Sequence, residues 1–202
     1  MLPRYDVHPG VLMMQKWVAE LPQKTGRSLE QWTRLVKKQG PTTEKERREW
    51  LKTKHQLGTN SAWWIAEHSV GKGGEDSDPQ SYLAAAVKYV DEMFGGAKAG
   101  LRPIYQALLE LGRGLGPDVK VCPCKTIVPF YRKHVFAQVK PSTRTRIDFG
   151  LALRKTKTPK RLIATGGLSK GDRLTHRFEI GSLSDIDAEV KTWLRKAYDL
   201  DI

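Results

Sequence analysis

The stretch RIDFGLALR, residues 146–154, alternates between large apolar and polar or small side chains. Its large apolar residues occupy the odd positions from 147 to 153, whereas Arg146, Asp148 and Arg154 occupy even positions. Successive side chains of a β-strand point to opposite faces, so this spacing predicts a strand with one apolar and one polar face. We expect the apolar face to lie against helices and the polar face to meet solvent.

The sequence on both sides of this strand predicts the rest of a meander. Apolar residues at period two predict further strands, at residues 126–132, 134–140, 161–165 and 175–180. Apolar residues at helical spacing predict helices at 80–94 and 99–112 before the sheet, and a closing helix that Ser184 caps. The predicted fold class is therefore α+β, an antiparallel meander with helices on one face.

A change in composition predicts where this part begins. Residues 71–79 read GKGGEDSDP and contain no apolar side chain except that of proline, which is typical of a linker. We therefore expect three segments: a helical domain at 1–70, a linker at 71–79 and an α+β domain at 80–202.

The predicted N-terminal domain contains short helices and is rich in tryptophan. Ser28 with Gln31, and Thr43 with Glu46, have the spacing of capping boxes, in which two side chains satisfy the first backbone N–H groups of a helix. Asn60 or Ser61 is expected to cap the last helix of this domain.

Composition also restricts the class of protein. No run of 18 apolar residues occurs, so no membrane-spanning helix is expected. The opening residues MLPRYD lack the layout of a signal peptide, so we expect a cytoplasmic protein. Cys122 and Cys124 are expected to be free thiols, because a disulfide that closes so small a ring would be strained.

The positive charge is concentrated in one part of the chain. Residues 120–177 hold 15 Lys and Arg against two acidic residues, Asp148 and Asp172, whereas the other 144 residues hold 20 of each sign. A local positive field of this kind attracts anions. We expect side chains from separate strands and turns to form one solvent-open cationic sheet face, although a solvated surface without a partner is the plain alternative.

This reasoning predicts nucleic acid or another polyanion as the partner, because lysine and arginine neutralise phosphates whatever the base sequence. No enzymatic activity is expected to accompany the binding. The predicted anion contacts are the cations of the strands and turns, namely Arg132, Lys133, Arg144, Arg146, Arg154, Lys155 and Arg177.

Catalytic and metal motifs are weak by comparison. Residues 43–69 have the length of a helix-turn-helix, but the second helix, SAWWIAEH, offers no Lys or Arg to DNA. Cys122, Cys124 and His134 lack the second ligand pair that zinc sites usually show, so no metal and no cofactor are predicted. Asp148 lacks the acid-x-Lys partner of restriction-type nucleases, and we expect it to pair with a neighbouring arginine.

A second hypothesis is that the chain is a small-ligand-binding protein or an enzyme. Its pocket would lie between the sheet and the helices at 80–112, with His134, Asp148 and His176 at its rim. Neither histidine has a Ser or Cys nucleophile nearby in the sequence, and no catalytic residue is assigned.

Two regions of the chain resemble known families. The residues KTGRS at 24–28, Trp32 and EWLK at 49–52 are similar to a short helical bacterial domain of unknown function. The residues LRPIY at 101–105 and PSTRTRIDFGL at 141–151 resemble a second uncharacterised bacterial domain. That domain is sometimes labelled a predicted transport protein and is found attached to restriction-type nucleases.

The resemblance implies a two-domain bacterial protein with no established activity. The meander is also similar to the double-wing DNA-binding family at the level of fold, which does not settle function. A third hypothesis follows, in which the chain is an accessory subunit of a nuclease or toxin. The Trp-rich N-terminal domain would then bind a protein partner or a second copy of the chain.

Overall fold

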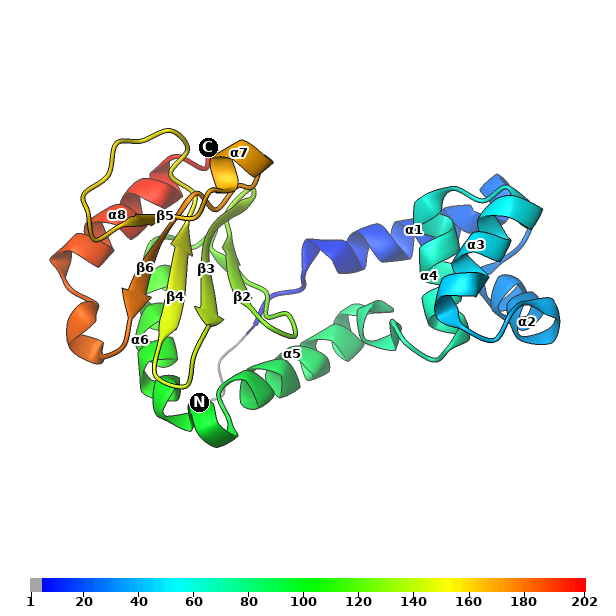
Figure 1. The fold of residues 1–202 in the computed structure, drawn as a ribbon, viewed down its shortest axis with the longest axis horizontal. Coiled ribbons are helices and arrows are strands. Elements are labelled where there is room, and N and C mark those ends of the chain that lie inside the picture. Colours follow the sequence, from blue (N-terminus) through cyan, green and yellow to red (C-terminus); the bar gives the residue numbers. More distant parts are fainter. Residues whose placement is uncertain (1–4) are drawn as a thin grey trace. The chain divides into compact units, whose positions relative to one another are not determined.

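The structure, a computed structural model, describes residues 5–202, apart from the side chains of Asp76 and Leu168. The chain divides into two compact units (Figure 1). The N-terminal unit is Val7–Ala85, and the C-terminal unit joins Tyr5 and Asp6 to Ala86–Ile202. This division falls at residue 85, inside helix α5 (Pro79–Met93), whereas composition predicts the linker at 71–79.

Four helices build the N-terminal unit, namely α1 (Pro9–Thr25), α2 (Leu29–Gln39), α3 (Glu44–His55) and α4 (Thr59–Ser69). Both predicted capping boxes are present, at Ser28 and at Thr43. The predicted cap of α4 is wrong, because Gly58 is its N-cap and makes no side-chain hydrogen bond. A short 3-10 helix, η1 (Gly74–Asp76), lies inside the predicted linker.

The core of the N-terminal unit is formed by the apolar faces of its helices. The side chains of Leu21, Trp32 and Leu51 are buried there, and α4 adds Ile65 and two alanines. Removing this apolar surface from water is the main force that holds helices as short as these together.

The C-terminal unit is α+β, as predicted. The end of α5 is followed by η2 (Gly96–Leu101) and α6 (Arg102–Arg113). The strands are β1 (Lys120–Val121), β2 (Val128–Tyr131), β3 (Val135–Pro141), β4 (Ile147–Leu151), β5 (Ile163–Ala164) and β6 (His176–Ile180). Helix α7 (Gly167–Lys170) precedes β6, and η3 (Leu183–Asp185) and α8 (Ala188–Asp199) follow it.

All strand pairs are antiparallel, in the order β1-β2-β3-β4-β6-β5. Phe149 is aligned with Val139 on one side and Phe178 on the other, which confirms the apolar face predicted for 146–154. Asp148 is aligned with Lys140 and Glu179, which lie on the opposite face. The sheet therefore has a covered apolar face and an open polar face.

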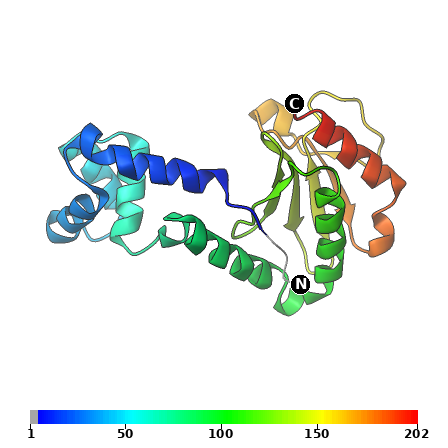
Figure 2. The same cartoon turned by 180° about the vertical axis from the view of Figure 1, so that it is seen from behind.

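Helices α6 and α8 lie on the covered face (Figures 1 and 2). Helix α6 approaches β2 closely at Gly112, because a Cβ at this position would lie 2.3 Å from the Phe130 ring. The side chains of Phe130, Phe149 and Phe178 are fully buried beneath the helices. The helices therefore cover one face of the sheet, and the polar face stays open.

Three elements differ from the sequence-based prediction. The short strand β1 is outside the predicted elements, and so is helix α7, which has Gly166 and Gly171 in the left-handed conformation at its two ends. Helix α8 is capped by Asp187 instead of Ser184, because the intervening residues form η3. Within residues 5–202, no helix has the length and hydropathy needed to cross a bilayer.

Candidate functional site

Most arginines of the charge-rich segment form ion pairs. Their carboxylate partners, apart from Asp148, lie outside residues 120–177, in flanking segments that the fold brings close. The pairs are Arg132 with Asp118, Arg146 and Arg177 with both Asp148 and Glu179, Arg161 with Asp187 and Glu189, and Arg173 with Asp201. The concentration of charge in the sequence is therefore partly neutralised in the folded unit.

The centre of the open face is a network of two cations and two anions. The strand register sets the carboxylates of Asp148 and Glu179 side by side, an arrangement that repels unless it is compensated. Arg177 Nη1 lies 2.9 Å from Asp148 Oδ1 and 2.7 Å from Glu179 Oε1, and Arg146 lies 3.1 Å from each carboxylate. The expected pairing of Asp148 with arginine is confirmed, and the predicted anion contacts Arg146 and Arg177 are both engaged by carboxylates.

Six of the seven predicted anion contacts are divided between the two ends of the sheet, and the seventh, Arg177, lies within β6. Arg132 and Lys133 lie in the β2–β3 turn, and Arg154 and Lys155 follow β4, so these four belong to the end where β3 begins and β4 ends. Arg144 lies in the β3–β4 turn at the opposite end, as does Arg146. The two groups therefore do not form one patch.

At the first of these ends, three arginines bind the last turn of α8 and the two residues that follow it. Arg132 Nη1 donates to the carbonyl of Tyr198 at 3.4 Å, Arg154 Nη2 donates to the carbonyl of Leu200 at 2.8 Å, and Arg173 Nη2 donates to Asp201 at 2.8 Å. The carbonyls at a helix C-terminus lack intrahelical partners and carry a partial negative charge. Guanidinium groups from three separate loops therefore meet around the end of α8.

A buried carboxylate fixes this arrangement. The Asp201 side chain is 3% exposed and accepts two hydrogen bonds from His134, at 2.8 Å from the backbone N–H and 3.0 Å from Nδ1. Since a carboxylate only accepts, the Nδ1 atom carries the proton, which leaves Nε2 of this 56% exposed side chain toward solvent. His134 thus anchors the β2–β3 turn to the C-terminal segment.

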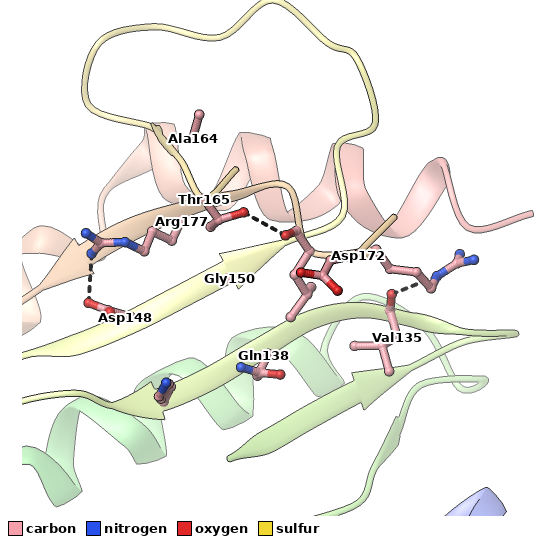
Figure 3. Close-up of a pocket in the computed structure, with 11 residues that line it drawn as sticks. Val135, Gln138, Asp148, Gly150, Ala164, Thr165, Asp172 and Arg177 are labelled. Carbon is pink, nitrogen blue, oxygen red and sulfur yellow. Dashed lines mark hydrogen bonds and ion pairs between the residues drawn. The ribbon is translucent and has the colours of Figure 1, made fainter. Parts of the chain in front are cut away.

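A hollow of about 780 Å³ lies on the open face (Figure 3). Three neighbouring strands form its floor, and the segments on both sides of α7 form its wall. The lining residues are Val135, Gln138, Lys140, Asp148, Gly150, Ala164, Thr165, Asp172, Arg173, Leu174 and Arg177. This hollow lies on the face of the sheet opposite to α6, whereas the predicted pocket lies between the sheet and the helices at 80–112.

Only one of the three residues predicted for a ligand rim lines the hollow. Asp148 belongs to its floor, but its carboxylate already accepts two arginines. His176 aligns with Leu151 on the covered face, where its ring is 6% exposed and lies 2.9 Å from the Thr175 hydroxyl. Burial lowers the pKa of His176, since desolvation disfavours the imidazolium.

Several exposed cations of the charge-rich segment have no carboxylate partner among the described residues, and five of them lie in the β2–β3 turn, the loop after β4 and the end of α7. We call these five, Lys133, Arg154, Lys155, Lys157 and Lys170, the basic rim. Among the residues that the structure describes, none of the five has a carboxylate partner, although the Arg154 guanidinium donates to a carbonyl.

Sequence reasoning missed the groups that come from loops and from the C-terminus. Gln138 and Lys140 could have been found, because they occupy the polar positions of a predicted strand. Arg173 and Asp201 carried no such signal, since their pairing joins segments 28 residues apart.

Cys122 and Cys124 are not joined by a disulfide, as expected. Burial raises the pKa of Cys122 to about 12, which keeps it protonated and unreactive at neutral pH. Within the described part of the chain, no three His, Cys, Asp or Glu residues gather in a group that could hold a metal ion.

These features define a two-unit α+β protein whose C-terminal unit carries a polar, open-faced antiparallel sheet. A family model described as a domain of unknown function (DUF5655) matches residues 90–201, which is more than half of the chain. The chain therefore belongs to this family. A second model, also described as a domain of unknown function (DUF4287), matches residues 13–73. Searches of curated proteins and of solved structures found no match.

Proposed function

We propose that the C-terminal unit binds nucleic acid through the basic rim. The observation that carries this proposal is the separation of the cations into two groups. Framework arginines such as Arg173 are engaged by carboxylates, whereas the rim cations are exposed and unpaired by carboxylates among the described residues. Two of them, Arg154 and Lys155, line a depression that shares Asp172 and Arg173 with the hollow. Exposed cations on several loops can follow a phosphate backbone, and they gain free energy by releasing its counterions.

We expect the main phosphate contacts to come from cations on the loops and not from the arginines on the strands. Arg146 and Arg177 would have to leave Asp148 and Glu179 before they could bind phosphate, which would expose two carboxylates to the incoming anion. Lys133 and Lys155 need no such exchange. These exposed lysines break no ion pair with a carboxylate when they move toward a phosphate, and their flexible stems let the ammonium groups reach it.

A salt titration with charge-matched variants tests this function. Binding of a labelled 20-nucleotide strand is measured by fluorescence anisotropy from 50 to 200 mM salt, for the native chain and two double variants. The rim variant combines Lys133→Gln with Lys155→Gln. The control combines Lys120→Gln with Lys191→Gln, two exposed lysines that form no ion pair among the described residues.

Both variants lose the same net charge, so only position distinguishes them. The rim variant should bind more weakly, and the slope of log affinity against log salt should decrease by roughly 1.4 to 1.8 if both lysines contact phosphates. The control should keep a slope close to that of the native chain. Equal losses in the two variants, or no binding at 50 mM salt, would refute the proposal.

The N-terminal unit is proposed to bind a protein partner or a second copy of the chain. The Trp63 ring on α4 is 43% exposed, with the Arg48 guanidinium 5.5 Å from its centre. An exposed indole next to a cation is typical of interface residues. Sedimentation of the native chain and of Trp63→Ala tests self-association, and a partner chain that co-purifies with the native protein but not with the variant would support the accessory-subunit hypothesis.

A further inference from the structure

The hollow on the open face shares two lining residues with a smaller depression, which two residues of the basic rim line. This depression of about 300 Å³ adjoins the end of α8, and Arg154 and Lys155 of the rim line it. Asp172 and Arg173 line both spaces. A strand whose phosphates lie on the rim would therefore pass directly beside the opening of the hollow.

The floor and wall of the hollow hold polar groups that the fold leaves unused. Over residues 5–202, the Gln138 amide, the Lys140 ammonium and the Asp172 carboxylate make no side-chain hydrogen bond or ion pair. An amide both donates and accepts, an ammonium only donates and a carboxylate only accepts. This set can satisfy the mixed donors and acceptors on the edge of a nucleic-acid base.

Apolar side chains complete the hollow. Leu174 lies over the sheet at Gly150, where a Cβ would be 3.4 Å from its Cδ1 atom. Val135 and Ala164 line other parts of the space, and Figure 3 shows them at opposite sides of Gly150. Apolar walls with a few polar groups are typical of sites for small organic molecules, and a volume of about 780 Å³ lies in their usual range.

We infer that the hollow receives one unstacked base of a bound strand, so that the protein selects single-stranded over double-stranded nucleic acid. This inference rests on the proposed function, because the rim must hold the phosphates. A base inside a duplex presents only its groove edges, and its paired edge and faces are already occupied. A base of a single strand can turn away from its neighbours and enter the hollow.

The test separates base binding from phosphate binding. Fluorescence anisotropy measures the affinity of the protein for labelled dT20 and rU20. The strand that binds more tightly is then compared with the duplex it forms with its complement, and with an abasic strand of equal length and charge. The variant is Gln138→Leu, which removes the amide but keeps a side chain of similar size. The control is Gln106→Leu, the same substitution at an exposed position of α6 on the covered side.

Four results are expected together. The intact strand should bind roughly five- to tenfold more tightly than the abasic strand and more tightly than the duplex. Gln138→Leu should weaken binding of the intact strand about fivefold and leave binding of the abasic strand unchanged, whereas the control should bind both strands as the native chain does.

The failures of the two proposals are distinguishable. Salt-dependent binding that is equal for intact strand, abasic strand and duplex would overturn the single-strand inference and leave rim binding in place. An equal effect of Gln138→Leu on the intact and abasic strands would also overturn it, because the amide would then not contact a base. Absence of binding to every probe would refute the proposed function itself.

Discussion

Replacement of Asp201 by alanine should destabilise the C-terminal unit by about 2–3 kcal/mol. The carboxylate is buried and accepts three hydrogen bonds, two from His134 and one from Arg173. Removing one member of a buried ion pair ordinarily costs about 3–5 kcal/mol, because the other charge is left without a partner. Here the two donor side chains are about half exposed and can regain water, so the expected loss is smaller.

For a unit of this size, that loss corresponds to a fall in melting temperature of roughly 8–12 °C. Urea unfolding followed by NMR signals of the β3 and β4 amides reports on this unit alone. The matched control is Asp172→Ala, which removes an exposed carboxylate and should change stability by less than about 0.5 kcal/mol. Equal stabilities of the Asp201 variant and the native chain would show that this carboxylate does not fix the loops around the end of α8.

Three further predictions concern individual positions. Burial lowers the pKa of His176 below its ordinary value of 6.5, so the neutral imidazole favours the folded state. The stability of the native unit relative to His176→Gln, measured by thermal unfolding, should therefore fall as the pH decreases from about 6.5 to the lower folded-state pKa. A stability difference that is the same at about pH 7.5 and about pH 5 would contradict this. Gly112→Ala should cost about 1–3 kcal/mol in urea unfolding, because the methyl group would collide with Phe130, whereas Gly100→Ala meets no atom and should cost less. Ser28→Ala should cost the N-terminal unit about 1 kcal/mol in the same assay, and a neutral result would mean that the capping box of α2 does not contribute.

The ion-pair network on the open face shows which features of the site depend on the sequence alone and which depend on the assembled sheet. Alternation in 146–154 correctly assigned Asp148 and Arg146 to the polar face, because side-chain direction in a strand depends on sequence parity alone. The alternation could not predict that Glu179 also lies beside Asp148 and neutralises the arginines of this face. The neutralising Glu179 belongs to a strand that is distant in sequence, and the register that aligns it with Asp148 is a property of the assembled sheet.

The hollow illustrates the same limit. Its floor follows from strand parity, so Gln138 and Lys140 were open to prediction, but its wall depends on where the chain turns after β5. Helix α7 was not predicted, because a four-residue helix between glycines has too little periodicity to be recognised. Asp172 and Arg173 follow this helix and acquire their positions from it.

The sequence by itself determined the α+β class, the two capping boxes of the N-terminal unit and the apolar and polar faces of the central strand. Each of these depends on residues that are near neighbours along the chain, where local geometry is set by backbone periodicity. Only the tertiary structure decided which cations are free. An ion pair forms between groups within a few ångströms in space. Asp118, Asp201 and Asp148, which engage Arg132, Arg173 and Arg177 respectively, belong to other segments of the chain and reach these arginines only in the folded unit.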